Sequence, residues 1–317
     1  MTTTAKPKAT RQAFGEALAE LGATNQKIVV CEADLSKSTK SELFGKKFPE
    51  RFFQMGIAEA NMISTGAGLA LSGFIPFVCS FGAFITGRYD QIRMSVAYSR
   101  AAVRLIGTHA GIGIGDDGHS QMGLEDLSLM RGLPTMMVFQ PADEIETRAI
   151  MSFITTDAEA LKHPAYLRLT RQALVPVHGA DYKFQLGKLD ILKRGAKVAL
   201  LASGAAVQEC LCAYEALKSK GLEATLVNVP TIKPFDKEGV LALARDHKYF
   251  VTVEDHYTTG GLGSAVAEAL AEGGSGAKLV RLGVQDMFGE SGEPAELYEK
   301  FGFAGPDIVK TILQTVG

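Results

Sequence analysis

Hydrophobic positions along this 317-residue chain form short apolar runs that alternate with longer segments of helical spacing. The first helical pattern covers residues 11–21 and ends at Gly22, a residue that favours helix ends. Longer helical patterns follow at 81–99 and 143–155. The apolar runs that predict strands are 27–31, 75–79, 103–106, 135–139 and 166–169. Short apolar strands separated by helices predict a parallel sheet covered on both faces, a doubly wound α/β domain.

The pattern changes between residues 173 and 188, where turn residues and broken periodicity indicate a linker. A second and smaller α/β pattern follows it. Its predicted strands are 198–201, 224–229, 249–253 and 278–282, and its predicted helices are 207–218, 237–245 and 264–271. The chain is long enough for two cores, so we expect two doubly wound domains, residues 1–178 and 179–317.

Charge and cysteine usage narrow the function classes. Lys and Arg number 33 and Asp and Glu number 35, well mixed along the chain, which argues against nucleic acid as a partner. No segment has the length of a membrane span, and residues 1–10 lack the apolar core of a signal peptide. The four cysteines do not have the spacing of a zinc site or a redox pair, so we expect buried thiols in a reducing, cytoplasmic environment; they are Cys31, Cys79, Cys210 and Cys212.

Glu59 lies in otherwise apolar surroundings. It follows the run 52–57, which predicts a short buried strand, and it begins a small-residue segment, 58–71, with the character of a helix. A glutamate in the first turn of a helix is common because it complements the helix dipole. The local sequence alone therefore supports a helix-start carboxylate and nothing more specific.

The glycine-rich loop 108–121 has the composition of a ligand-binding segment. It follows the predicted strand 103–106 and should lie at the carboxyl edge of the sheet, where open α/β folds bind ligands. Glycines permit close approach of the backbone, and the polar side chains supply donors and acceptors. These side chains are His109, Asp116, Asp117, His119 and Gln121. The alternative is a flexible surface loop with incidental polar residues.

Other motifs are less informative. Phe81 and Phe84 stand three apart at the start of a helical pattern; such pairs usually belong to a core, although near a sheet edge they could present a ring to a planar ligand. Glycine runs at 111–115 and 260–263 lack the spacing and context of a dinucleotide fingerprint. The sequence contains neither a P-loop nor a serine in a nucleophile elbow.

Four segments together resemble transketolase, a thiamine-diphosphate enzyme, in its pyrimidine-binding and C-terminal domains. They are residues 53–62, 80–93, 107–134 and 251–267. The run 115–126 is the most specific, and its Gln121 resembles the animal-type branch, where bacterial and yeast enzymes carry histidine. The resemblance covers essentially the whole chain.

A complete transketolase has a further domain before this region, with a Gly-Asp-Gly motif and an Asn-Asn pair that hold magnesium and the diphosphate. This sequence has no such motif and no adjacent asparagines. The resemblance therefore implies the C-terminal half of a split transketolase. It also implies an N-terminal subunit as partner, in an α2β2 heterotetramer that binds thiamine diphosphate and Mg²⁺, with the metal and diphosphate ligands on the partner.

The resemblance further implies roles for individual residues. Glu59 hydrogen-bonds ring nitrogen N1′ of the aminopyrimidine and favours the imino form that removes the thiazolium C2 proton. The cofactor-binding set is Glu59, Phe81, Phe84 and Asp34. The substrate set is Arg11, Ser38, His109, Asp117, Gln121 and Arg171, of which Arg11, Ser38, His109 and Arg171 receive the terminal phosphate. The catalytic set is Glu59, His109 and Gln121.

The implied reaction transfers a two-carbon ketol group from a ketose phosphate to an aldose phosphate, as in the pentose phosphate pathway. His119 stands where the family commonly has a small residue or proline, and Arg88 is displaced by one position, so a modified or branched ketose phosphate stays open. So do a deoxyxylulose-phosphate synthase-like enzyme, a 2-oxo-acid dehydrogenase β-like subunit and a non-catalytic regulatory module. Residues 253–257 match the family without a derivable catalytic role; we expect them to be structural or interfacial, with His256 hydrogen-bonded in a loop.

Overall fold

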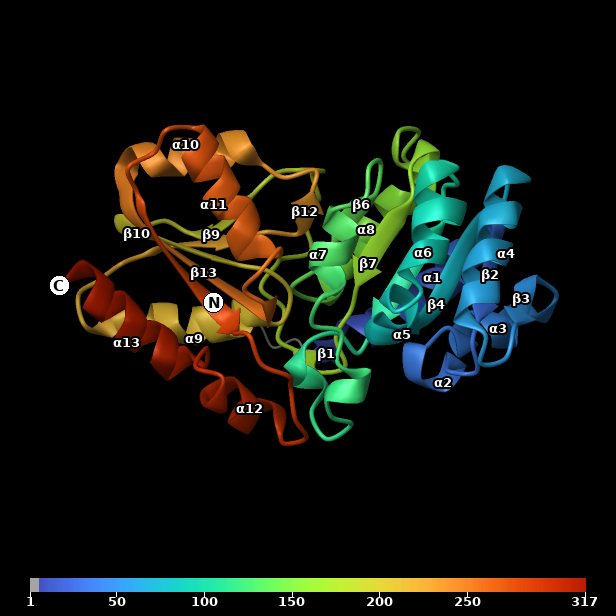
Figure 1. Cartoon of the computed structure of the whole chain (residues 1–317), viewed down its shortest axis with the longest axis horizontal. Coiled ribbons are helices and arrows are strands. Elements are labelled where there is room, and N and C mark those ends of the chain that lie inside the picture. The colour runs from blue at the N-terminus through green and yellow to red at the C-terminus, as the bar shows by residue number, and fades with distance from the viewer. Residues whose placement is uncertain (1–5) are drawn as a thin grey trace.

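A computed structural model describes residues 6–317 and contains two α/β domains side by side (Figure 1). Residues 1–5, part of the stretch expected to lack a signal peptide, lie outside the described residues. The first sheet has the strand order β12 (Thr231–Lys233), β6 (Met137–Phe139), β7 (Ala165–Arg168), β5 (Arg104–Thr108), β4 (Ile75–Phe81), β2 (Ile28–Glu32) and β3 (Phe52–Gln54). Its strands pair in parallel except β12, which confirms the predicted parallel sheet.

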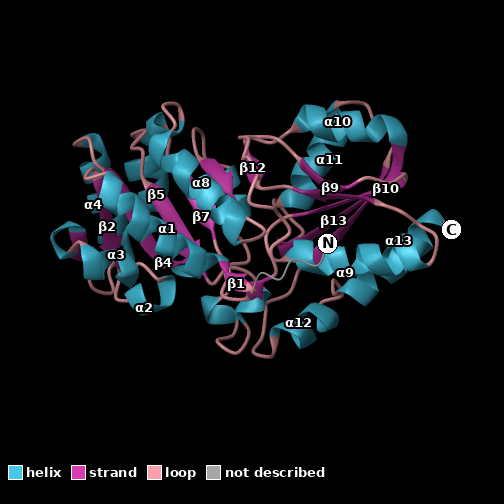
Figure 2. Cartoon of the chain, turned by 180° about the vertical axis from the view of Figure 1, so that it is seen from behind, coloured by secondary structure: helices cyan, strands magenta, loops and turns pink. Residues whose placement is uncertain are grey.

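Helices cover both faces of the first sheet. Helices α1 (Thr10–Thr24) and α8 (Glu144–Thr156) pack on each other over the face seen in Figure 2. The other face is covered by α4 (Glu59–Leu71) and by the π-helix η2 (Ile92–Tyr98). The central strands are buried between these layers, and this explains why they are apolar throughout instead of alternating.

Two predicted elements near the site are wrong. Residues 81–99 do not form one helix: Phe81 ends β4, and α5 (Gly82–Thr86), α6 (Tyr89–Gln91) and η2 follow. The break comes after Gly87, a poor helix former, where Arg88 has the non-helical angles φ −106 and ψ 41. The predicted buried strand 52–57 is instead the short edge strand β3, with Phe53 39% and Ile57 84% exposed.

The second domain confirms the predicted α/β pattern. Its sheet has the order β14 (Lys278–Val284), β13 (His247–Tyr257), β10 (Lys197–Ala202), β11 (Thr225–Asn228) and β9 (Asp190–Lys193). Only β9, which the sequence pattern does not predict, pairs antiparallel. Its helices are α9 (Ala206–Ser219) and α13 (Gly305–Val316), which pack together, α10 (Lys237–Asp246) and α11 (Leu262–Glu272), which pack together on the other side, and α12 (Pro294–Lys300).

The two domains are interlocked. Strand β12 follows the second domain's β11 in sequence but pairs with β6 at the edge of the first sheet, beside it in Figure 1. The segment predicted as a linker contains His178, which is buried and bonded through Nδ1 to Asp143 and through Nε2 to Asp190, each at 2.8 Å. The segment thus carries a polar clamp between a first-domain helix cap and β9.

The remaining elements are short. They are β1 (Lys8–Ala9), paired antiparallel with β8 (Ala173–Leu174), α2 (Ser36–Thr39), α3 (Glu42–Lys47), α7 (Asp126–Arg131), and the 3-10 turns η1 (Pro49–Arg51), η3 (Ile112–Ile114), η4 (His119–Gln121) and η5 (Ala160–Lys162). Three cysteines are buried as expected, but Cys212 is exposed on α9, which corrects the prediction for that thiol. Among residues 6–317, no helix is long and apolar enough to cross a membrane.

Candidate active site

The residues expected to form a site follow the carboxyl ends of neighbouring strands in the first sheet. Asp34 and Ser38 come after β2, Phe84 after β4, His109 after β5 and Arg171 after β7. These strands are parallel, so their ends meet at one edge, the usual ligand-binding edge of an open α/β sheet.

Arg11 lies at the start of α1 and joins two other predicted residues. Its guanidinium NH1 donates to the backbone oxygen of Ser38 at 2.9 Å and to Nε2 of His109 at 2.6 Å. Its Nε is buried and has no hydrogen-bond partner among residues 6–317. The structure therefore brings Arg11, Ser38 and His109 together, with Ser38 contributing its carbonyl to this contact and not its hydroxyl.

His109 has both ring nitrogens occupied by the protein. Because the guanidinium of Arg11 can only donate, Nε2 accepts and Nδ1 carries the proton, which it donates to Oγ1 of Thr108 at 2.8 Å. Thr108 in turn donates to the backbone oxygen of Ser80. Burial, followed by the charges of Arg11 and Arg171, lowers the pKa of His109 to about 3. The imidazole is therefore neutral at ordinary pH.

Arg171 belongs to the same end of the site. Its NH1 donates to the backbone oxygen of Ile114 at 3.0 Å, to Asp116 at 2.8 Å and to Asp117 at 3.4 Å. Burial and the nearby charge of Arg171 lower the pKa of Arg11, which indicates that the two guanidinium groups feel each other. A cationic end of the site thus lies beside the glycine-rich loop.

Glu59 lies at the other end of the site. It is the first residue of α4, is only 5% exposed, and accepts one side-chain hydrogen bond, from Ser80 at 3.4 Å. The ring of Phe81 stacks on His109 at 3.7 Å and on Phe84 at 5.3 Å between centroids. Phe81 is therefore covered by its neighbours, and Phe84 presents the half-buried ring.

The other predicted residues lie around this line of contacts. Asp34 is exposed, in a left-handed backbone conformation with φ 64, and its backbone N–H donates to Gln54 at 2.7 Å. Gln121 is half-buried in η4, which packs against α5. His119 accepts the backbone N–H of Gly289 through Nδ1 at 3.1 Å, so the second domain engages it, while Arg88 is exposed.

The sequence reasoning assigned no role to Glu32. Its buried carboxylate accepts from Thr39 Oγ1 at 2.5 Å, from Ser41 Oγ at 3.1 Å and from the N–H of Ala33 at 2.8 Å. Burial raises its pKa to about 7. These bonds fasten the segment that carries Asp34 and Ser38; an acidic residue that ends an otherwise apolar strand is the signal that could have revealed it.

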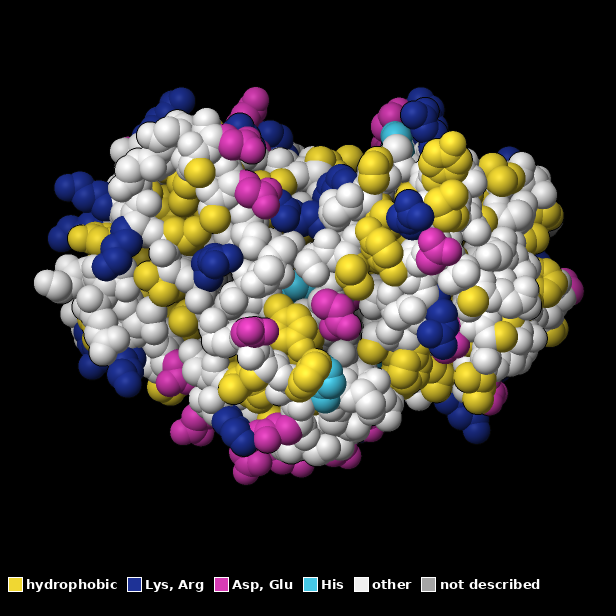
Figure 3. All heavy atoms as spheres, viewed as in Figure 1, with side chains coloured by type: hydrophobic (Ala, Val, Ile, Leu, Met, Phe, Trp, Pro, Cys, Tyr) yellow, Lys and Arg dark blue, Asp and Glu magenta, His cyan; other side chains and the backbone are white. Residues whose placement is uncertain are grey.

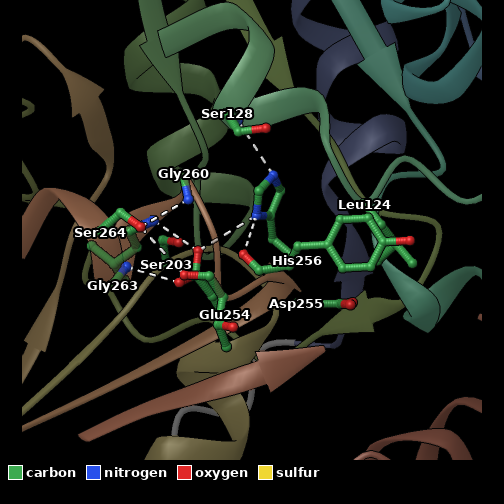
Figure 4. Close-up of polar contacts among 12 residues, drawn as sticks. Leu124, Ser128, Ser203, Glu254, Asp255, His256, Gly260, Gly263 and Ser264 are labelled. Atoms are coloured by element: carbon green, nitrogen blue, oxygen red, sulfur yellow. Dashed lines mark hydrogen bonds and ion pairs between the residues drawn. The ribbon is translucent and has the colours of Figure 1, made fainter. Parts of the chain in front are cut away.

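Residues 254–256 join the domains behind the site (Figure 4). His256, expected to be a hydrogen-bonded histidine, is confirmed as one: Nδ1 donates to the oxygen of Tyr257 at 2.6 Å and Nε2 accepts the N–H of Ser128 at 3.4 Å. Burial lowers its pKa to about 4, so the ring is neutral. Asp255 contacts the glycine-rich loop of the first domain, a role the sequence does not reveal.

Two family models match the chain. The transketolase pyrimidine-binding domain matches residues 6–176, and the transketolase C-terminal domain matches residues 187–308. Together these matches extend over both α/β domains.

Individual relatives agree with the family models. A protein of Methanocaldococcus jannaschii named as a transketolase C-terminal section is 43% identical over 310 residues, 97% of this chain and 96% of that protein. The 6-deoxy-6-sulfo-D-fructose transketolase subunit SqwH of Clostridium sp. is 40% identical, over 95% of this chain and 92% of its own length. Homo sapiens transketolase is 37% identical over 96% of this chain, which spans 48% of that longer protein.

A solved structure gives the same result. The split-gene transketolase described as an inactive beta4 tetramer matches with a TM-score of 0.88 and 44% identity, over 96% of this chain and 97% of that one. The chain therefore belongs to the transketolase family and corresponds to its pyrimidine-binding and C-terminal domains.

Proposed function

We propose that this chain is the C-terminal subunit of a split transketolase that transfers a two-carbon ketol group from a ketose phosphate to an aldose phosphate. The observation that carries the proposal is the continuous line of contacts at the sheet edge. It runs from Glu59 through Ser80 and the stacked ring of Phe81 to His109 and Arg11. A buried carboxylate thus stands at one end of a connected site and two arginines at the other.

The residues at the carboxylate end fit the aminopyrimidine of thiamine diphosphate. Glu59 supplies a buried carboxyl that can hold or share a proton with ring nitrogen N1′, and Phe84 supplies a half-buried ring for a flat heterocycle. When bound, thiamine diphosphate supplies the nucleophilic carbon and the electron sink for ketol transfer. We assign Phe81 to support of Phe84 and Asp34 to the rim of the cofactor site.

The residues at the cationic end suit a sugar with a terminal anion. Arg11 and Arg171 carry fixed positive charge, and the buried Nε of Arg11 is an N–H without a partner among residues 6–317. His109, neutral, orients Arg11 through Nε2. We assign the sugar hydroxyls to Asp117 and Gln121, which lie on the loop that leads from Arg171 toward α5.

The partner in this proposal is an N-terminal transketolase subunit, which holds Mg²⁺ and the diphosphate. The human enzyme is about twice as long as the region matched here, and the missing half would supply those ligands. Several large hydrophobic side chains are exposed on β3, α4, η2 and the turn after α4, and hydrophobic side chains reach the surface of the right-hand domain in Figure 3. They are Phe53, Ile57, Leu71, Phe74, Met94 and Tyr98. Such a surface supports an obligate assembly, proposed as α2β2.

Co-expression with a candidate N-terminal subunit tests the proposal. The purified complex is assayed for ketol transfer with thiamine diphosphate and Mg²⁺, beside each chain alone, and its mass is measured in solution. We expect transfer only from the complex, and none from a complex that carries Glu59→Gln. Activity of this chain alone would contradict the split enzyme, and an assembled complex with no transfer to any phosphorylated or sulfonated sugar would contradict the reaction.

A sulfonated sugar is a second candidate substrate. The Clostridium sp. relative, whose name specifies 6-deoxy-6-sulfo-D-fructose, is 40% identical, close to the 43% of the archaeal transketolase section. Phosphate and sulfonate are both oxyanions that two guanidinium groups can bind. The ratio of kcat/KM for 6-deoxy-6-sulfofructose and for a ketose phosphate distinguishes the two. Both comparisons name transketolases, so we do not pursue the synthase-like, dehydrogenase-like or non-catalytic alternatives.

A further inference from the structure

Asp255 of the second domain holds the backbone of the glycine-rich loop in the first domain. The side chain lies on β13 and is 2% exposed. Its Oδ1 accepts the N–H of Ile112 at 2.7 Å, and its Oδ2 accepts the N–H of Gly113 at 3.1 Å. Two charge-assisted hydrogen bonds in a buried position fix a loop strongly, because their loss leaves buried N–H groups without partners.

Tyr298 of α12 extends this contact to the segment that carries Arg171. Its hydroxyl donates to Oδ2 of Asp255 at 2.8 Å and accepts from Nε2 of Gln172, the neighbour of Arg171, at 3.0 Å. One carboxylate and one phenol of the second domain therefore reach both segments at the cationic end of the site.

The loop glycines are explained by this contact. Gly111 has φ +88, and a Cβ there would lie 2.2 Å from Oδ2 of Asp255. A Cβ on Gly113 would lie 2.3 Å from Gln172 and 2.5 Å from the hydroxyl of Tyr298. The sequence interpretation gave these glycines to a bound ligand, but the groups that come close to them belong to the protein itself.

We propose that Asp255, assisted by Tyr298, is a positioning residue for the cationic end of the site. The connection runs through three consecutive residues: Asp255 fixes the N–H groups of Ile112 and Gly113, and the next carbonyl, of Ile114, accepts from Arg171 at 3.0 Å. The second domain thereby sets where the guanidinium of Arg171 meets the terminal anion of the sugar. This inference rests on the proposed function and gives its second domain a role in substrate recognition.

The neighbouring residue offers a matched control. Glu254 is also fully buried, on the opposite side of β13, and its carboxylate also accepts two backbone N–H groups, from Leu262 at 2.7 Å and Gly263 at 2.8 Å. Both donors belong to the start of α11 in the same domain (Figure 4). Glu254→Gln therefore removes a comparable buried charge without touching the glycine-rich loop.

The kinetic test uses the complex of both subunits with thiamine diphosphate and Mg²⁺. In Asp255→Asn, the new amide NH₂ faces a backbone N–H, so we expect KM for a phosphorylated substrate to rise about tenfold. We expect kcat, and KM for a substrate without the terminal phosphate, to change less than twofold. Glu254→Gln should keep the KM of the wild type, and Tyr298→Phe should raise it less than Asp255→Asn. An equal rise in KM for both kinds of substrate, or the same rise in Glu254→Gln, would overturn the inference.

Hydrogen exchange on this chain alone provides a readout that does not depend on activity. Asp255→Asn should speed amide exchange in residues 111–115 at least tenfold, while Glu254→Gln should speed it at the start of α11 and leave the loop protected. Tyr298→Phe, which keeps the carboxylate, serves if Asp255→Asn does not fold. Unchanged loop protection in these variants overturns the positioning role. Absence of ketol transfer in the wild-type complex instead removes the proposed function and leaves the exchange result to decide whether the second domain fixes the loop.

Discussion

The two ends of the candidate site differ in how far this chain completes them. At the cationic end, Arg11, His109 and Arg171 all bond to other groups of the chain. At the carboxylate end, Glu59 has one side-chain bond, at 3.4 Å, and Phe84 is only half-buried. The chain thus builds the anion-binding end by itself and supplies one wall of the other end, as expected of half an active site.

The difference has a physical cause. Arginines and a buried histidine need hydrogen-bond partners to be stable, so the cationic end requires a local network whether or not substrate is bound. A carboxylate at the first residue of a helix is stabilised by the helix dipole and by nearby backbone N–H groups. Glu59 can therefore stay available to a cofactor without a dedicated partner in this chain.

The largest effect should come from Glu59→Gln at the open end. Loss of the carboxylate removes the group that shares a proton with the cofactor, so turnover of the complex should fall roughly 10²- to 10⁴-fold. The unfolding temperature should not change, because few contacts are lost. Glu215→Gln, at an exposed position of α9, is the control. Wild-type turnover in Glu59→Gln would remove the distinction between the two ends.

His178→Asn should destabilise the domain junction without altering either end. Burial opposes the charge of His178, but hydrogen bonds to Asp143 and Asp190 and the charge of Glu146 outweigh it and raise its pKa to about 10. Because the folded pKa lies above the unfolded value of 6.5, this stabilisation is complete below pH 6.5 and is lost as the pH rises toward 10.

The cost of His178→Asn should be about 3–5 kcal/mol at pH 6 and should shrink toward pH 10. Denaturant unfolding of both proteins across this range measures it. Below the unfolding temperature, KM should be that of the wild type. A changed KM would mean that the site depends on the junction as a whole and not on its own local network.

Arg11→Met should weaken the cationic end selectively. Hydrogen bonds to charged groups contribute about 1.5–3 kcal/mol, so kcat/KM for a phosphorylated substrate should fall roughly 10- to 100-fold. A substrate without the anion should be affected much less. Arg148→Met, which removes ion pairs to Glu16 and Glu20 on the outer side of α1, serves as control. Equal losses on both substrates would argue against an anion site at Arg11.

The smallest effect concerns His109 and pH. Its folded pKa of about 3 lies below the unfolded value, so the unfolded chain binds the proton more readily and stability falls as the pH drops below 6.5. At pH 5.5 the loss from this group is about 1 kcal/mol, and it vanishes at pH 7.5. His109→Asn should flatten the unfolding free energy between pH 5 and 7. An unchanged slope would show that the imidazole is not held neutral at the closed end.

Much of the fold follows from the sequence because strands buried on both faces must be apolar throughout. The runs at β2, β4 and β5 have that property, and their prediction is confirmed. Strands β9 and β12 were not predicted, since β9 is only half-buried and the three residues of β12 are too few to show a pattern. The helix expected over 81–99 is wrong because Gly87 and the turn at Arg88 interrupt it.

The sequence by itself determined which residue types follow each strand, and the topology of a parallel sheet brings those strand ends to one edge; the roles of Glu59, Arg11 and His109 stay predictions. Only the tertiary structure decided how their side chains are held: that Nε2 of His109 faces Arg11, and that Asp255 bonds to backbone groups 143 residues away at Ile112. Apolar periodicity is local and visible in a single sequence. A contact between a side chain and a distant backbone N–H leaves no pattern there, since every residue other than proline offers the same donor.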